Sequence, residues 1–140
     1  MIRAPSPATL TASTTVDIVA DCRIIAAMDQ EIITRLKKRI VTEGLDAVIA
    51  VSPENVTYVS GFVVPSQSLM RWRHAACIVT ADGRVSMVAV DMEATTVKAH
   101  AEIKDLRVYR EFIDDPMDRI TDALRDMRLD HGKVGIEMEF

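Results

Sequence analysis

The chain has 140 residues, of which 49% are apolar and 27% charged, which suits one globular domain with a single hydrophobic core. Its net charge of −4 at pH 7 argues against a nucleic-acid binder, which normally carries a basic patch. No apolar run approaches the roughly 20 residues of a membrane-spanning helix, and two cysteines without metal or redox spacing fit a reducing, cytoplasmic setting.

The first residues predict an arm followed by a helix. Residues 1–28 are interpreted as a partly disordered N-terminal arm: residues 1–14 are rich in Pro, Ser, Thr and Ala, and residues 15–27 fit either a strand or an extra helical turn. From Asp29 to Thr42, apolar residues recur at helical spacing, and Gly44 follows as a natural C-terminal cap. The globular domain is therefore expected to span residues 29–140.

A strand and a short helix come next. Residues 46–52 (DAVIAVS) are almost all apolar, as in a strand covered on both faces. Residues 53–59 (PENVTYV) predict a short helix, with Ser52 as N-cap, Pro53 at the first helical position and Gly61 after the end.

Candidate binding residues lie in this helix and in the connection that follows it. Asn55 can hydrogen-bond backbone amides and hold a turn, Tyr58 can bury its ring and expose its hydroxyl, and Gly61 permits a backbone angle that other residues resist. The connection from Phe62 to Arg73 is long and carries aromatics and arginines, which is typical of binding loops, although surface packing is an open alternative. Its candidate substrate contacts are Phe62, Arg71, Trp72 and Arg73.

The second half alternates strands and helices. Residues 74–90 predict a β-hairpin around Asp82–Gly83, followed by a helix over 92–101 and a strand over 106–111. Residues 114–132 predict a helix capped by Asp115 and ended by Gly132. Its expected buried stripe is Met117, Ile120, Leu124 and Met127. A last strand begins at Lys133, so the fold class is α/β, a single domain with a mixed β-sheet flanked by helices.

No complete active site is visible in the sequence, and no catalytic or metal-ligating residue is assigned. The three histidines lack partners at metal-ligand spacing, and Ser60 and Cys77 lack a neighbouring base. Carboxylates cluster at Glu111, Asp114, Asp115 and Asp118, but Asp115 and Asp118 already serve the start of the helix there, which favours capping over acid/base chemistry. Glu137 and Glu139 would share one face of a strand, but nothing nearby supplies further metal ligands.

The segment RLKKRIVTEGLDAVIAVSPENVTYVSGF (residues 35–62) resembles the opening of the N-terminal domain of the creatinase/prolidase family, which includes aminopeptidase P and Xaa-Pro dipeptidases. The matching residues are Gly44, Leu45, Asp46, Pro53, Asn55, Tyr58, Ser60, Gly61 and Phe62. Residues 78–93 (IVTADGRVSMVAVDME) and 133–140 (KVGIEMEF) are similar to later parts of that domain. The resemblance therefore covers about residues 30–140.

This resemblance implies a small α/β domain with a ribonuclease H-like motif, followed in the parent protein by a larger catalytic C-terminal domain that is absent from this chain. In the family's peptidases the second domain holds two divalent metal ions on two Asp, one His and two Glu, and the metals activate water. None of that set can be placed here, so no cofactor is expected in this chain, and the two metal ions are expected in the missing domain.

The family also implies partners. Its members are often homodimers in which loops of one N-terminal domain help to wall the neighbour's active site. The expected partners are a second copy, the chain's own catalytic domain and a proline-containing peptide, whose carboxylate an arginine could pair with. Because the chain stops at Phe140 inside an apolar segment, we expect it to be the front part of a longer protein.

Three readings of function stay open. The first is the non-catalytic N-terminal domain of a metal-dependent Xaa-Pro peptidase, which shapes substrate access, supports dimerisation and is inactive alone. The second is the same domain of a creatinase-like amidinohydrolase, which uses no metal. The third is a non-catalytic module for protein binding or dimerisation.

Overall fold

Helices and strands alternate along the chain in the order that its apolar periodicity predicts. The computed structural model describes residues 30–70 and 72–138, so the predicted arm (residues 1–28), Cys22, Arg71 and Glu139 lie outside the described residues. The helices are α2 (Gln30–Thr42), α3 (Pro53–Ser60), α4 (Pro65–Leu69), α5 (Ala94–His100) and α6 (Pro116–Asp126), with a 3-10 turn, η1 (Asp91–Glu93), before α5. The strands are β1 (Ala47–Ala50), β2 (Ala76–Thr80), β3 (Val85–Val90), β4 (Asp105–Tyr109) and β5 (Val134–Ile136).

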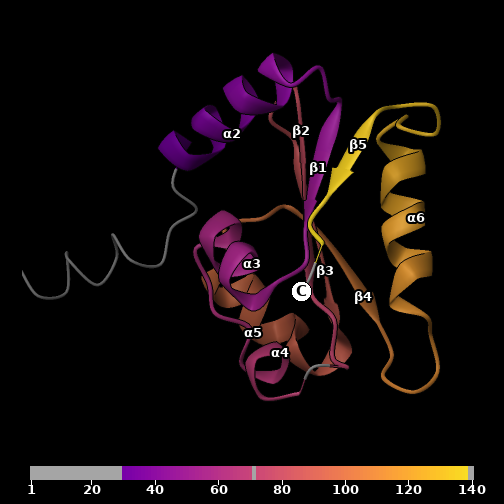
Figure 1. Ribbon diagram of the computed structural model, residues 1–140. Coiled ribbons are helices and arrows are strands. Elements are labelled where there is room, and N and C mark those ends of the chain that lie inside the picture. The colour runs from indigo at the N-terminus through magenta and orange to yellow at the C-terminus, as the bar shows by residue number, and fades with distance from the viewer. Residues whose placement is uncertain (1–29, 71, 139–140) are drawn as a thin grey trace, which may run out of the picture.

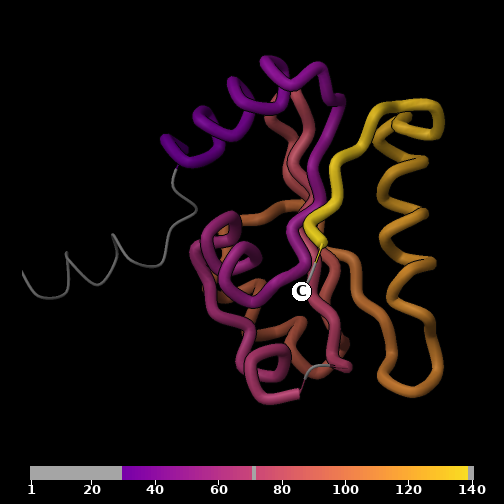
Figure 2. The backbone as a smooth tube through the Cα atoms, viewed as in Figure 1, coloured from indigo at the N-terminus to yellow at the C-terminus, as the bar shows by residue number. Residues whose placement is uncertain are grey.

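The strands form one five-stranded mixed sheet in the order β4-β3-β2-β1-β5. Strand β2 is antiparallel to both β1 and β3, whereas β5 runs parallel to β1 and β4 runs parallel to β3. In Figure 2 the yellow C-terminal strand β5 lies along β1, although the two are far apart in the sequence. The predicted α/β class with a mixed sheet is confirmed.

Helices cover both faces of the sheet, because strand side chains alternate between the faces. Helices α2, α3 and α5 lie on one side and α6 lies on the other (Figure 1). The first face packs a cluster that includes Ile40, Val56, Cys77, Val79, Met87 and Val97. The second packs Ala47, Ile49, Ile78, Val88, Ile120 and Ala123.

Local sequence signals set the ends of α3 as predicted. The Ser52 hydroxyl accepts a hydrogen bond from the Asn55 amide, and Pro53 occupies the first turn, where its missing N–H costs nothing. At the other end Gly61 adopts a left-handed conformation with φ 69°, and its N–H bonds to the Thr57 carbonyl. The expected cap, first residue and terminator are all confirmed.

The end of α6 was predicted wrongly. The helix stops at Asp126 rather than near Gly132, because Arg128 takes a left-handed conformation with φ 60°. The Arg128 N–H then bonds to the Arg125 carbonyl and the Leu129 N–H to the Leu124 carbonyl, which completes a Schellman termination without glycine. This leaves His131 beyond the helix rather than at its C-terminal end.

Met117 is also not part of the buried stripe of α6. Its side chain is 48% exposed, whereas Ile120 and Met127 are buried as expected. Met117 sits in the first turn of α6, next to the loop that follows β4, where it lines a surface groove instead of the core.

Three further boundaries differ from expectation. The connection from Phe62 to Arg73 is not an open loop, since α4 interrupts it. Strand β4 begins and ends slightly earlier than predicted, and β5 is a strand only over Val134–Ile136. Within residues 30–70 and 72–138, no helix is long and apolar enough to cross a membrane.

Candidate functional site

The candidate residues gather at one edge of the sheet. Strands β1, β3, β4 and β5 point the same way, so their carboxyl ends meet there. In open α/β sheets ligands bind outside these carboxyl ends. Helix α3, the segment from α4 to β2, the turn after β4 and the end of β5 all start or finish at this edge. We call it the carboxyl edge.

At the carboxyl edge, two segments that carry the family resemblance meet. The Asn55 side-chain amide donates to the Glu137 carboxylate at 2.6 Å, and the backbone amides of Val51 and Ser52 donate to it at 2.9 Å each. Asn55 therefore ties α3 to the segment after β5, rather than serving backbone amides with its side chain as expected. The Glu137 carboxylate thus accepts from three donors.

These contacts set the ionisation of Glu137. Burial alone would raise its pKa, but the hydrogen bonds from Ser52, Val51 and Asn55 outweigh it and lower the pKa from 4.5 to about 2. Asp114 behaves similarly, because hydrogen bonds from Arg110 lower its pKa to about 2. Both carboxylates are therefore ionised at neutral pH.

The lowered pKa of Glu137 predicts a loss of stability in acid. A carboxyl whose pKa is lower in the folded than in the unfolded chain stabilises the fold above the unfolded value, and this contribution disappears as the pH falls. We expect the difference in free energy of unfolding between wild type and Glu137→Gln to shrink between pH 4.5 and about 2. Urea denaturation at several pH values measures it, and a difference that stays constant across this window would contradict the assignment.

The segment that follows α3 is held in place by contacts of Ser60 and Phe62. The Ser60 hydroxyl is buried and bonds to both the amide and the carbonyl of Phe62. The Phe62 ring stacks on His100 at the end of α5, with ring centroids 5.7 Å apart. Phe62 is thus an anchor between two helices. Tyr58 is more exposed than expected, at 46%, and lines a small groove beside Ile136.

Helix α4 is held by buried polar side chains that the sequence analysis did not single out. The Gln67 amide donates to the carbonyls of Val51 at 2.7 Å and Ala75 at 3.1 Å, which joins the end of β1 to the approach to β2. The buried Glu93 carboxylate accepts from the Ser66 amide at 3.0 Å. No local pattern signals these roles, since each depends on a partner in another element.

Arg73 and Trp72, which follow α4, have opposite environments. The Arg73 guanidinium donates two hydrogen bonds to Glu111, at 2.6 and 3.0 Å, and these bonds raise the pKa of Arg73. A substrate carboxylate would have to displace Glu111 to bind there. Trp72 is 64% exposed. The two residues line a groove of about 480 Å³ together with the turn after β4 and the start of α6, which we call the Trp72 groove.

Three of the four carboxylates within residues 111–118 have a structural partner. Glu111 pairs with Arg73, Asp114 pairs with Arg110, and Asp115 accepts from the Met117 amide as the predicted helix cap. Among residues 30–70 and 72–138, no group of three or more His, Cys, Asp or Glu side chains could hold a metal ion.

The possible nucleophiles are inaccessible. Ser60 is fully buried, and burial raises the pKa of Cys77 to about 12, which keeps its thiol protonated. Neither residue can attack a substrate in this fold.

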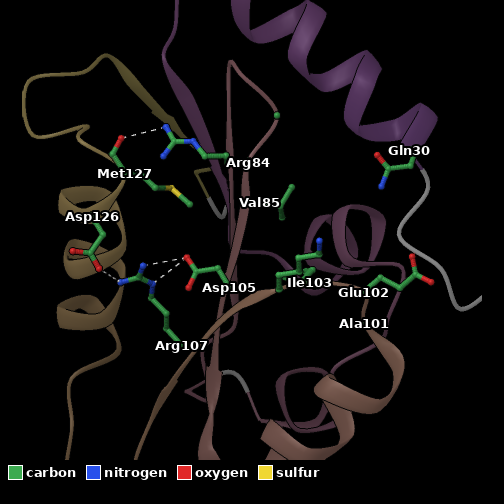
Figure 3. A pocket seen from close by; sticks show the side chains of 12 residues that line it. Gln30, Arg84, Val85, Ala101, Glu102, Ile103, Asp105, Arg107, Asp126 and Met127 are labelled. Atoms are coloured by element: carbon green, nitrogen blue, oxygen red, sulfur yellow. Dashed lines mark hydrogen bonds and ion pairs between the residues drawn. The ribbon is translucent and has the colours of Figure 1, made fainter.

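A larger groove lies at the opposite edge of the sheet. It has a volume of about 840 Å³ and lies between the end of α6, the start of β4 and the start of α2 (Figure 3). Within it, Arg107 bonds to Asp105 and Asp126, and Arg84 donates to the Met127 carbonyl. These bonds brace α6 against the sheet, so the carboxyl edge remains the better candidate despite its smaller groove.

Comparisons with known proteins agree with this geometry. The family model described as the creatinase/prolidase N-terminal domain matches residues 32–140. The fold is similar to the N-terminal domain of an Xaa-Pro dipeptidase from Lactobacillus brevis, with a TM-score of 0.64, 17% identity and 75% of each chain covered. It is also similar to a proline dipeptidase from Streptococcus pneumoniae, with a TM-score of 0.62 and 21% identity over 75% of this chain and 72% of that one.

One similar structure belongs to a much longer chain. The prolidase from Pyrococcus horikoshii matches with a TM-score of 0.58 and 19% identity over 79% of this chain but only 27% of its own. No curated protein sequence matches the chain. At these identities the solved structures show the fold alone, whereas the family model spans well over half of the chain. The chain belongs to the creatinase/prolidase N-terminal domain family.

Proposed function

We propose that this chain is the non-catalytic N-terminal domain of a metal-dependent Xaa-Pro peptidase, in which it shapes access to the active site and supports dimerisation. The observation that carries the proposal is the domain match over residues 32–140. The solved structures with this fold include N-terminal domains of Xaa-Pro dipeptidases, such as the one from Lactobacillus brevis. The two divalent metals and their ligands would belong to a following domain, as would the chemistry.

The geometry of the carboxyl edge supports a role in shaping access. The last described residues leave β5 at this edge, where Glu137 fixes them to the start of α3. A domain that follows β5 would therefore start at the carboxyl edge, which also carries the Trp72 groove.

Each candidate contact residue has a distinct part in this proposal. Trp72 offers an exposed ring to a proline-containing peptide or to a neighbouring subunit. Phe62 and Arg73 act through position, because Phe62 stacks on His100 and Arg73 holds Glu111. Arg71 lies outside the described residues and stays a candidate for pairing with a peptide carboxylate.

Two measurements test the proposal. We expect the pure 140-residue chain to hydrolyse no Xaa-Pro dipeptide at any added divalent metal concentration, as judged by release of free proline. Clear metal-dependent turnover would overturn the non-catalytic assignment. We also expect the gene to continue in frame beyond Phe140 into a domain with Asp, Asp, His, Glu and Glu ligands. A continuation without such ligands would favour a creatinase-like or a purely binding protein.

A further inference from the structure

The groove of about 840 Å³ lies at the edge of the sheet where β3 and β4 start, and we call it the amino-edge groove. Gln30, the first residue of α2, is part of its lining. Figure 3 shows Gln30 on the side of Glu102 and Ile103, with Met127 on the other side of Val85. The residues that precede Gln30 in the chain therefore leave from the groove itself.

The lining of the amino-edge groove is apolar beneath its charged rim. Ile103 and Met127 are only 9% and 7% exposed, and Val85 is partly buried. Val85 and Ile103 belong to the core under α2, α3 and α5, whereas Met127 belongs to the core under α6. An apolar segment placed in the groove would therefore extend both cores at once.

The sequence before Gln30 contains a segment of this kind. In residues 16–28, VDIVADCRIIAAM, every residue except Asp17, Asp21 and Arg23 is apolar. Residues 1–14, in contrast, are rich in Pro, Ser, Thr and Ala. An apolar run of this length is too short to cross a membrane and is more typical of a segment that packs against protein.

Chain connectivity favours this segment over other occupants of the groove. Ile24 and Ile25 precede Gln30 by six and five residues, so an extended chain can carry them up to about 20 Å from it. A segment tethered in this way is present at an effective concentration on the order of mM. A second copy of the chain or a free ligand must compete with that concentration.

The charges at the rim also suit the segment. Glu102 and Lys104 are exposed, lie on either side of Ile103 in the sequence and line the groove. Arg23 and Asp21 carry the opposite charges, in positions next to the apolar residues that would enter the groove. Exposed ion pairs of this kind add more to the choice of partner than to stability.

We propose that residues 16–28 bind in the amino-edge groove of their own chain. Ile24 and Ile25 pack on the floor formed by Val85, Ile103 and Met127, and the segment joins the start of α2 to the end of α6. This inference goes beyond the proposed function and does not depend on it. With the amino edge closed in this way, the carboxyl edge is the one left for substrate and for other domains.

Cys22 allows a direct test, because it lies within residues 16–28. The other cysteine, Cys77, is buried, and burial raises its pKa to about 12, so its thiol does not compete. Lys104→Cys places a new thiol at the rim of the groove. Oxidised glutathione should then form a disulfide to Cys22 within the monomer, which non-reducing electrophoresis detects.

Lys38→Cys is the matched control. Lys38 is exposed on α2, about 12 Å along the helix from Gln30, so an unbound segment could reach it as well. A segment held in the groove should link to Lys38→Cys at least about tenfold more slowly than to Lys104→Cys. Equal rates would overturn the proposal. Disulfide-linked dimers in place of monomers would mean that the segment enters the groove of a second copy, which would overturn its assignment to the same chain.

A variant within the segment tests the packing without touching the groove. Ile25→Asp puts a charge against the apolar floor, so it should release the segment, lower the thermal midpoint by about 5 °C and slow the link to Lys104→Cys. Leu10→Asp adds the same charge outside residues 16–28 and should change neither value. An Ile25→Asp protein with the midpoint and the linking rate of the parent would contradict the proposal.

Discussion

Replacement of Glu137 by alanine is expected to lower the free energy of unfolding by about 3 kcal/mol. The Glu137 carboxylate accepts from the amides of Val51 and Ser52 and from the Asn55 side chain. Hydrogen bonds to a charged acceptor are each worth about 1.5 to 3 kcal/mol, and the three are not additive because the site is only partly buried. The variant also detaches the segment after β5 from α3. Urea denaturation of the 140-residue chain measures the change.

Two controls separate the contact from a general effect of charge. Glu54→Ala removes an exposed carboxylate from the first turn of α3, the helix that Glu137 contacts. It should lower the free energy of unfolding by less than about 1 kcal/mol. Asn55→Ala combined with Glu137→Ala forms a double-mutant cycle, and we expect a coupling energy of about 1 kcal/mol. A loss for Glu137→Ala no larger than that for Glu54→Ala would show that the contact does not stabilise the fold.

The contact between Asn55 and Glu137 also marks the limit of prediction from sequence. The capping of α3 by Ser52 and Gly61 was predictable, because both signals act within a few residues. The partner of Asn55 was not, since 82 residues separate it from Glu137 and no local rule joins a helix to the end of a distant strand. The resemblance placed both segments in one family but did not indicate that they touch.

The same distinction explains the errors in α6. Asp115 was identified as the cap because its carboxylate acts on the next turn. The helix end was misplaced because Gly132 was taken as the terminator, whereas Arg128 adopts the left-handed conformation despite its side chain. Met117 fits the helical spacing of the buried stripe, but the first turn of α6 borders the Trp72 groove rather than the core. Helical spacing alone does not show whether another element packs over a residue.

The predicted contact residues have structural environments that the sequence did not indicate. Trp72 is exposed beside a groove, whereas Arg73 is bonded to Glu111, for which the sequence indicated no partner. The two are 38 residues apart, on segments before β2 and after β4.

Replacement of Gln67 by leucine should cost about 2 to 3 kcal/mol and loosen the segment that carries Trp72. Gln67 is only 7% exposed, and its amide serves the carbonyls of Val51 and Ala75, which lie beyond the paired ends of β1 and β2. Leucine fills a similar volume but leaves both carbonyls without this donor. Loss of a buried partner costs more than the bond itself contributes, because the remaining group stays desolvated.

The consequence of Gln67→Leu for the site is specific. Helix α4 has only five residues, so side-chain contacts rather than its own hydrogen bonds hold it in place. Without Gln67, the Ser66–Glu93 contact is the main remaining polar anchor that the structure assigns to its first turn. The emission spectrum of Trp72 should change. Ser68→Ala, on the exposed side of α4, should leave both the free energy of unfolding and the emission unaltered. A Gln67→Leu protein as stable as the wild type would show that packing of Phe62 and Val64 alone positions the segment, and that the polar anchors beneath α4 are dispensable.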